Sequence, residues 1–203
     1  MTKRLHKSVA AGDTKNRILD ATADFFRRQG YHGTGIKQIL ATANAPFGSL
    51  YHFFPNGKEQ LGAEVIHRSG ALYRQLFEFI MDRASDVRTG IGDFFLGAAE
   101  TLRSTDYADA CPIAAIALDV ASTSEPLRQA TADVFESWRD AAAERLVRAG
   151  IAPNHARALA LSIISTLEGA FVLSRAMKST EPMEAAKALA CQAVAEALLS
   201  GRG

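Results

Sequence analysis

The chain has 203 residues, 48% hydrophobic and 22% charged, with a formal net charge of +1 at pH 7. This length suffices for a sizeable core, and two cysteines, Cys111 and Cys191, are too few for a disulfide framework or a metal site. The sequence has no uninterrupted run of about 18 apolar residues and no apolar signal segment, so we expect a cytoplasmic protein without a membrane span.

Charge is distributed unevenly along the chain. Residues 1–60 contain nine Lys and Arg against four Asp and Glu, whereas residues 61–203 contain fourteen against eighteen. This distribution suits a polyanion-binding module joined to a neutral or acidic body, and a basic solvated tail would explain it equally well. We expect residues 1–13 to form a flexible basic arm.

Apolar residues recur at helical spacing along almost the whole chain. A first helix is predicted over roughly residues 14–29, with Gly30 as its stop, and a second begins at Thr34, a good N-cap. After a tight turn at residues 42–45, a short helix follows from Pro46 to Phe54, and a long one starts near Lys58. Five further helices are predicted over residues 87–104, 111–121, 125–149, 154–176 and 182–200. The sequence therefore predicts an all-α fold with about nine helices.

The second and third predicted helices have the dimensions of a helix-turn-helix, whose second helix lies in the major groove of DNA. In the third helix, Leu50 and Phe54 share a face that can pack against the preceding helices. A glycine on the other face permits close approach to a base or phosphate, and Ser, Tyr and His side chains can donate hydrogen bonds there. The residues of this other face are Gly48, Ser49, Tyr51 and His52.

The stretch "YHGTGIKQILATANAPFGSLYHFFPNGKEQL" resembles the DNA-binding domain of the tetracycline-repressor (TetR) family of bacterial transcriptional regulators. The resemblance covers residues 14–61, and the residues at family-typical spacing are Phe25, Gly30, Thr34, Ile39, Gly48, Leu50, Tyr51, Phe54, Lys58 and Leu61. The "CPIA" segment at residues 111–114 and the pattern "GSLYH.FP.GKE" are also similar to the lincomycin-resistance-repressor subgroup. That similarity suggests a regulator of drug-efflux or flavonoid-responsive genes.

The resemblance implies a three-helix DNA-binding domain over residues 14–57 and a ligand-binding and dimerisation domain over residues 58–203. It implies that Thr34 caps the second helix and contacts phosphate, that Lys37 contacts phosphate or a base, and that Lys58 binds the DNA backbone. The recognition surface would consist of Gly48, Ser49, Tyr51 and His52.

Three departures from the family pattern prevent a prediction of the operator sequence. Pro46 and Phe47 stand where the family often has Ser-Lys, so Phe47 either meets a thymine methyl group or packs inward. Phe53 replaces a polar Tyr or His and cannot make a phosphate contact through a hydroxyl or imidazole. Gly57 adds a residue to the turn before Lys58.

The two C-terminal helices carry stripes of apolar and small residues that permit close helix packing. The resemblance implies that they form a two-fold dimer interface; without it, packing into the subunit's own core is the preferred interpretation. The interface candidates are Leu159, Ile163, Leu167, Ala170, Leu189 and Ala193.

The body of the protein also has candidates for a ligand cavity: Phe79, Phe94, Leu118, Phe135, Trp138, Glu168 and Phe171. Phenylalanines are more often plain core than pocket lining. Trp138 and Glu168 are more informative, because the indole N–H needs a partner and a carboxylate among apolar neighbours requires one.

The sequence therefore predicts a ligand-responsive regulator: a repressor that binds a palindromic operator as a homodimer and is released by a small hydrophobic ligand. Metal-ligand spacings, phosphate-binding glycine motifs and nucleophile motifs do not stand out, so we expect neither a cofactor nor enzymatic activity. The alternative is a helical protein-interaction adaptor without sequence-specific DNA binding, which the basic N-terminal third disfavours.

Overall fold

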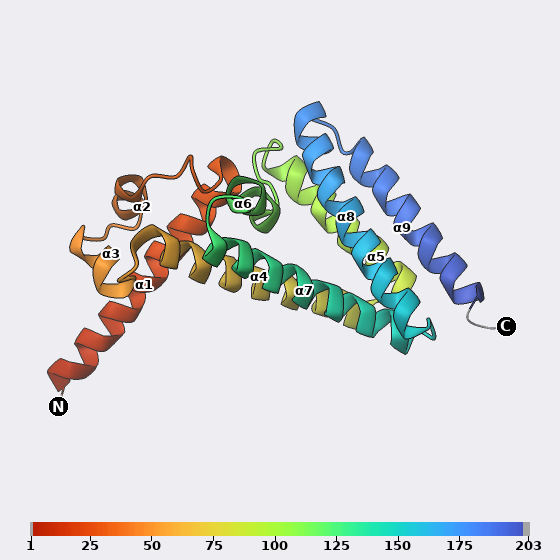
Figure 1. Ribbon diagram of the computed structural model, residues 1–203, viewed down its shortest axis with the longest axis horizontal. Helices are drawn as coiled ribbons and strands as arrows, with labels where there is room; N and C mark the ends of the chain where they lie inside the picture. The colour runs from red at the N-terminus through yellow and green to blue at the C-terminus, as the bar shows by residue number, and fades with distance from the viewer. Residues whose placement is uncertain (1, 201–203) are drawn as a thin grey trace. The chain divides into compact units, whose positions relative to one another are not determined.

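The computed structural model describes residues 2–200, and their side chains from residue 13 onward. The described residues form nine helices and no strand, which confirms the predicted all-α class (Figure 1). The helices are α1 (Thr2–Gln29), α2 (Ile36–Thr42), α3 (Gly48–Phe53), α4 (Gly57–Arg83), α5 (Val87–Ser104), α6 (Pro112–Val120), α7 (Glu125–Arg148), α8 (Pro153–Met177) and α9 (Glu181–Ser200).

The chain divides into two compact units. The first contains the residues up to Ser69 together with Pro112–Ala132, and the second contains Gly70–Cys111 and the residues from Asp133 onward. The first unit therefore holds α1, α2, α3 and α6, the beginning of α4 and the beginning of α7. The predicted functional division at residue 58 stays a prediction, whereas the contacts add α6 to the N-terminal unit.

Turn chemistry sets the ends of the first helices. α1 begins at Thr2, well before residue 14, and ends at Gln29, directly before Gly30, whose φ of +69° favours glycine. α2 ends where Asn44 adopts φ +47°, and the Ala45 N–H donates to the Leu40 carbonyl at 2.9 Å. The positive φ of Asn44 and this hydrogen bond define a Schellman motif. The motif forms the tight turn that was predicted from the sequence.

The core of the first unit joins α1, α2, α3 and the start of α4. Leu50 and Phe54 are fully buried, which confirms the inward face predicted for the third helix. The other fully buried large side chains of this core include Ile18, Phe26, Ile39, Leu61 and Ile66. Each contributes about 1.5–3 kcal/mol of hydrophobic stabilisation, so the core holds α3 by its inward residues and leaves its outer face free.

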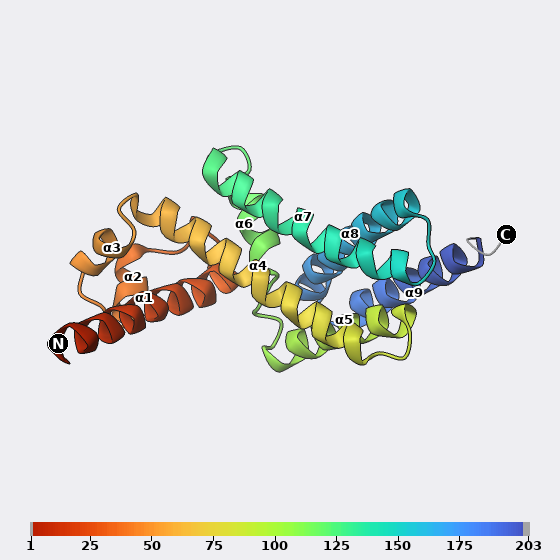
Figure 2. The ribbon, with the colours of Figure 1, turned by 90° about the horizontal axis from the view of Figure 1, so that it is seen from below.

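In the second unit, α5, α8 and α9 lie side by side (Figures 1 and 2). α8 has the length and apolar composition of a membrane-spanning helix, but its apolar residues Ala156, Leu159, Ala160 and Ile163 belong to this unit's core. Packing against α9 and α5 therefore explains the apolar residues on this side of α8.

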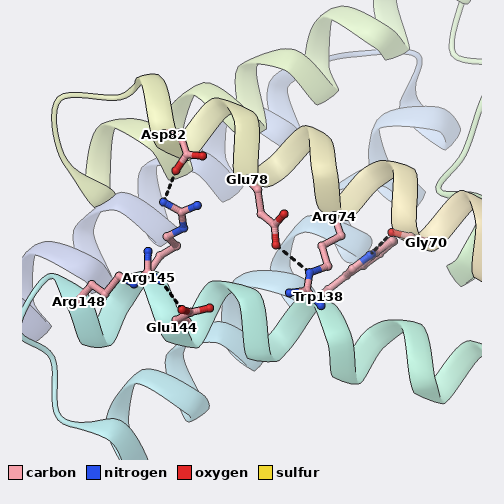
Figure 3. Close-up of polar contacts among 8 residues, drawn as sticks. All are labelled: Gly70, Arg74, Glu78, Asp82, Trp138, Glu144, Arg145 and Arg148. Atoms are coloured by element: carbon pink, nitrogen blue, oxygen red, sulfur yellow. Dashed lines mark hydrogen bonds and ion pairs between the residues drawn. The ribbon is translucent and has the colours of Figure 1, made fainter.

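The part of α4 that lies in the second unit packs against α7 (Figure 3). The Trp138 indole N–H donates to the Gly70 carbonyl at 2.8 Å, and Arg145 of α7 pairs with Asp82 of α4. A Cβ on Gly70 would lie 2.5 Å from both γ-carbons of Val134, so the two backbones approach as closely as they do because residue 70 has no side chain.

Candidate nucleic-acid interface and regulatory residues

The outer face of α3 presents two aromatic rings to solvent. Phe47 is 58% exposed and Tyr51 53% exposed, and their ring centroids are 6.4 Å apart. Gly48 and His52 are also exposed, and Ser49 is half-buried. We call Phe47, Gly48, Ser49, Tyr51 and His52 the α3 surface; together with exposed Lys37 on α2 it can meet the base edges and phosphates of a groove.

Phe47 does not pack inward. Its ring contacts Tyr51 on the exposed side, whereas Phe53 is half-buried and lies between the His52 ring, at 4.7 Å, and the Phe54 ring, at 6.4 Å. The structure thus contradicts inward packing of Phe47. The alternative, contact with a thymine methyl group, stays a prediction.

Thr34 occupies a different position from the one predicted. Gly35 is the N-cap of α2 and makes no side-chain capping bond, so the prediction that Thr34 caps this helix is wrong. The Thr34 side chain is buried, and its hydroxyl donates to the Gly30 carbonyl at 2.6 Å. The positive φ of Gly30 turns this carbonyl toward Thr34, and the hydroxyl stabilises the loop instead of α2.

Lys58 is half-buried at the start of α4. Its ammonium donates to the Tyr31 carbonyl at 2.6 Å and lies 4.2 Å from the centroid of the Tyr31 ring. Burial lowers the pKa of Lys58, and the charge of Asp119 partly opposes that shift. The lysine predicted to bind the DNA backbone is thus held by the loop before α2.

Sequence reasoning missed Asp119 on α6. Its carboxylate accepts the Tyr31 N–H at 2.8 Å, across 88 positions of the chain. A lone acidic residue in an apolar helix carries no periodic signal that would reveal such a partner. The one signal in the sequence is its place near the C-terminus of a helix, where a negative charge is unfavourable without a partner.

The ligand candidates do not gather in one place. Leu118, which belongs to the first unit, is 80% exposed, and Phe79 is 54% exposed with the Arg83 guanidinium over its ring. Phe94 and Phe171 pack against the core of the second unit, Phe94 in an edge contact with Phe77. Phe135 and Tyr73 each contact the Trp138 ring by an edge.

Glu168 on α8 is the least satisfied of the candidates. Both carboxylate oxygens are shielded from solvent, and neither makes a hydrogen bond of suitable geometry with the described part of the chain. Burial raises the pKa of Glu168 to about 7, although the Cys111 thiol lies close enough to lower it somewhat. Near physiological pH, Glu168 can therefore carry either a neutral carboxyl group or a carboxylate.

Most of the interface candidates lie within the subunit. Leu159, Ile163, Leu167 and Ala170 are buried in the core of the second unit, and Ala193 packs against it, whereas Leu189 is exposed. The exposed face of α8 consists of small and apolar residues at helical spacing. It includes Ala158, Leu161, Ser165, Gly169, Val172, Leu173 and Ala176.

Comparison with known proteins decides the family. Residues 18–65 match the bacterial regulatory proteins of the tetR family, and residues 88–189 match the C-terminal domain of LmrA/YxaF-like transcriptional regulators. The HTH-type regulator YxaF of Bacillus subtilis is 38% identical over 86% of this chain and 92% of its own. The chain belongs to the TetR family of transcriptional regulators. Within the family, its C-terminal domain is of the LmrA/YxaF-like type.

Two further comparisons agree with this TetR assignment. The HTH-type regulator LmrA of Bacillus subtilis is 32% identical over 86% of this chain and 93% of its own. The crystal structure of a TetR regulator from Chloroflexus aurantiacus aligns with a TM-score of 0.77 and 26% identity, covering 92% of this chain and 96% of that one. The predicted family and subgroup are thus confirmed, and the α3 surface lies within the segment that matches the TetR DNA-binding domain.

Proposed function

We propose that the protein is a ligand-responsive repressor that binds a palindromic operator as a homodimer and is released by a small hydrophobic ligand. The observation that carries the proposal is the α3 surface. It exposes Tyr51 and His52 of α3 together with Phe47 directly before the helix, while Leu50 of α3 and Phe54 directly after it are buried. Membership of a family of transcriptional regulators supports DNA as the partner.

The chemistry of the α3 surface suits a major groove. The phenol of Tyr51 and the imidazole of His52 can bond to phosphates or base edges, and the exposed Phe47 ring can contact a thymine methyl group. A Cβ on Gly48 would meet no neighbour, so the backbone there can approach a base closely. Lys37 on α2 adds a positive charge for the phosphates.

A dimer would place two such surfaces on successive turns of DNA, about 34 Å apart. For its interface we propose the exposed face of α8, with Leu189 and Leu199 on α9. This face is apolar and has small residues, so another helix can approach it closely. This proposed interface lies on the side of α8 opposite to the α8 residues predicted from the sequence, which are buried in the subunit's own core.

The regulatory ligand is proposed to bind in the second unit. Glu168 is the polar candidate, because a buried carboxyl without a well-formed hydrogen bond offers an acceptor or a donor to an incoming molecule. Trp138 is a weaker candidate than Glu168, since its N–H is already bonded to the Gly70 carbonyl. Ligand binding that favours a conformation with misaligned α3 surfaces would lower operator affinity. A regulator of this kind acts in the cytoplasm.

The proposal is tested by selecting DNA with the purified protein. Fragments of the source genome are passed over the immobilised protein at low and moderate salt, and those retained are sequenced. We expect enrichment of a palindromic site near the protein's own gene or a neighbouring one. Retention without an enriched sequence would reduce the α3 surface to non-specific phosphate contacts, and no retention at either salt would favour the adaptor.

A further inference from the structure

The end of α6 is tied to the loop before α2. Asp119 Oδ2 accepts the Tyr31 N–H at 2.8 Å and lies 3.4 Å from the His32 backbone nitrogen. In the reverse direction, the His32 Nε2 lies 3.2 Å from the backbone carbonyl oxygen of Asp119. The side chain of Asp119 therefore contacts residues 31 and 32, and its main chain contacts residue 32.

The helices alone do not explain a carboxylate at this position. Asp119 is the penultimate residue of α6, and the residues that it contacts directly follow the C-terminus of α1. The dipoles of both helices disfavour a negative charge there. The peptide N–H groups of the loop and the nearby charge of Lys58 offset this cost.

Gly30 is adapted to the carboxylate in two ways. Its φ of +69° allows the chain to turn so that the next two N–H groups point toward Asp119, as in other anion-binding nests of the backbone. A Cβ at residue 30 would lie 2.3 Å from Asp119 Oδ2, so any other residue would displace the carboxylate.

The loop that Asp119 holds determines where α2 begins. The Thr34 hydroxyl bonds back to the Gly30 carbonyl, the Thr34 N–H bonds to the Tyr31 carbonyl at 3.2 Å, and Lys58 bonds to the same carbonyl. α2 starts two residues after Thr34, and the turn at Asn44 connects α2 to α3. Little freedom remains between residue 31 and the helix-turn-helix.

We propose that Asp119 is a positioning residue for DNA binding: by holding the amides of Tyr31 and His32, it fixes the loop that sets α2 and α3. The inference rests on the proposed function, because α3 is taken as the recognition helix. α6 begins directly after Cys111, where the chain returns from the second unit, so this contact makes operator affinity depend on the position of α6.

The first arm of the test compares Asp119→Ala with Asp20→Ala. Asp20 is a matched control: it belongs to the same unit, and its exposed carboxylate pairs with Arg68 at 2.7 Å. Each substitution removes one negative charge, which by itself strengthens DNA binding. We expect Asp119→Ala to lower affinity for the retained genomic fragment about tenfold, against this charge effect, as the loss of a charged hydrogen bond implies. Affinity for a random-sequence duplex should change by less than about twofold, and Asp20→Ala should lose nothing on either duplex.

The second arm measures hydrogen exchange of the DNA-free protein, which reports positioning whether or not DNA binds. We expect Asp119→Ala to raise exchange in peptides covering residues 30–53 and Asp20→Ala not to. Unchanged exchange in that segment would overturn the inference, as would equal loss of affinity for both duplexes with a rise in exchange throughout the protein.

If the wild-type protein retains no fragment, the proposed function fails while the exchange data still decide the role of Asp119. Should Asp119→Ala not fold, Asp119→Asn, which keeps the shape and one acceptor, undergoes the same test with a smaller expected loss.

Discussion

Glu168 makes the stability of the protein depend on pH. Its pKa is raised from 4.5 to about 7 because both carboxylate oxygens are buried, so the folded state binds a proton that the unfolded state has already lost. The contribution of this residue to stability is therefore complete below about pH 4.5 and is lost as the pH rises through 7. The shift corresponds to a loss on the order of 3 kcal/mol.

We expect Glu168→Gln to abolish this loss. The difference in free energy of unfolding, variant minus wild type, should increase by up to about 3 kcal/mol between pH 4.5 and pH 8. Denaturant unfolding at several pH values and one fixed protein concentration measures it, and the subtraction removes the titration of all other groups. A difference that stays constant with pH would show that the carboxylate finds a partner or water in solution.

Tyr51 tests the α3 surface at the same scale. Tyr51→Ala removes a side chain that is 53% exposed and whose ring pairs with Phe47, so we expect operator affinity to fall about tenfold or more while helicity and stability stay unchanged. Tyr51→Phe keeps the ring contact with Phe47 and removes the hydroxyl. Equal losses in both variants would identify the hydroxyl as the DNA contact, and loss in neither would remove Tyr51 from the interface. Affinity is measured by titration of the retained fragment.

At the scale of elements, the contact between α4 and α7 depends on Gly70. We expect Gly70→Ala to lower stability by about 1–3 kcal/mol, because the added Cβ would overlap Val134, despite the better helix propensity of alanine. Gly97→Ala is the matched control: a Cβ there meets nothing within 4 Å, so that variant should be slightly more stable. Thermal unfolding measures both. Val134→Ala in the Gly70→Ala background should restore part of the loss, and no recovery would mean that the helices are not held at this point.

Helix positions were largely predictable because they depend on local signals. The predicted range 87–104 coincides with α5, and the turn at Asn44 followed from a residue that tolerates positive φ. Thr34 failed for a physical reason: a threonine before a helix can cap it or bond backwards, and the choice depends on the Gly30 carbonyl, which the preceding turn places. The predicted contact of Lys58 with the DNA backbone stays a prediction, but its bond to a carbonyl 27 residues away could not be foreseen from local signals.

At the scale of the whole molecule, burial decides which residues are available to partners. A stripe of apolar residues in the sequence does not by itself show whether those residues face the core or a partner. The pattern at Leu159, Ile163 and Leu167 was recognised, but a helix of small and apolar residues has two apolar sides, and the sequence does not say which faces the subunit's own core. Asp119 was missed because the residues that it holds lie in another part of the chain. The family and fold could be predicted from local motifs, whereas the assignment of individual residues required the tertiary contacts.

The exposed side of α8 gives the last prediction, which concerns assembly. Gly169 lies in the middle of this face, and a Cβ there would meet nothing within 4 Å inside the subunit. Gly169→Leu should therefore leave the subunit folded and even favour its helix, but it should prevent a second α8 from approaching closely. We expect the dissociation constant of the dimer to rise by about tenfold or more, at a cost of about 1–3 kcal/mol for overpacking.

Gly97→Leu is the control for this prediction, since it makes the same change at an exposed glycine of α5 that also has open space around it. Sedimentation over a range of protein concentrations should show a dimer that weakens in Gly169→Leu and persists in Gly97→Leu. Because the proposed function requires two α3 surfaces to engage one palindrome, operator affinity should fall together with dimerisation. A Gly169→Leu protein that remains fully dimeric would place the interface away from the middle of α8, and a wild-type protein that is monomeric at every concentration would contradict the dimer itself.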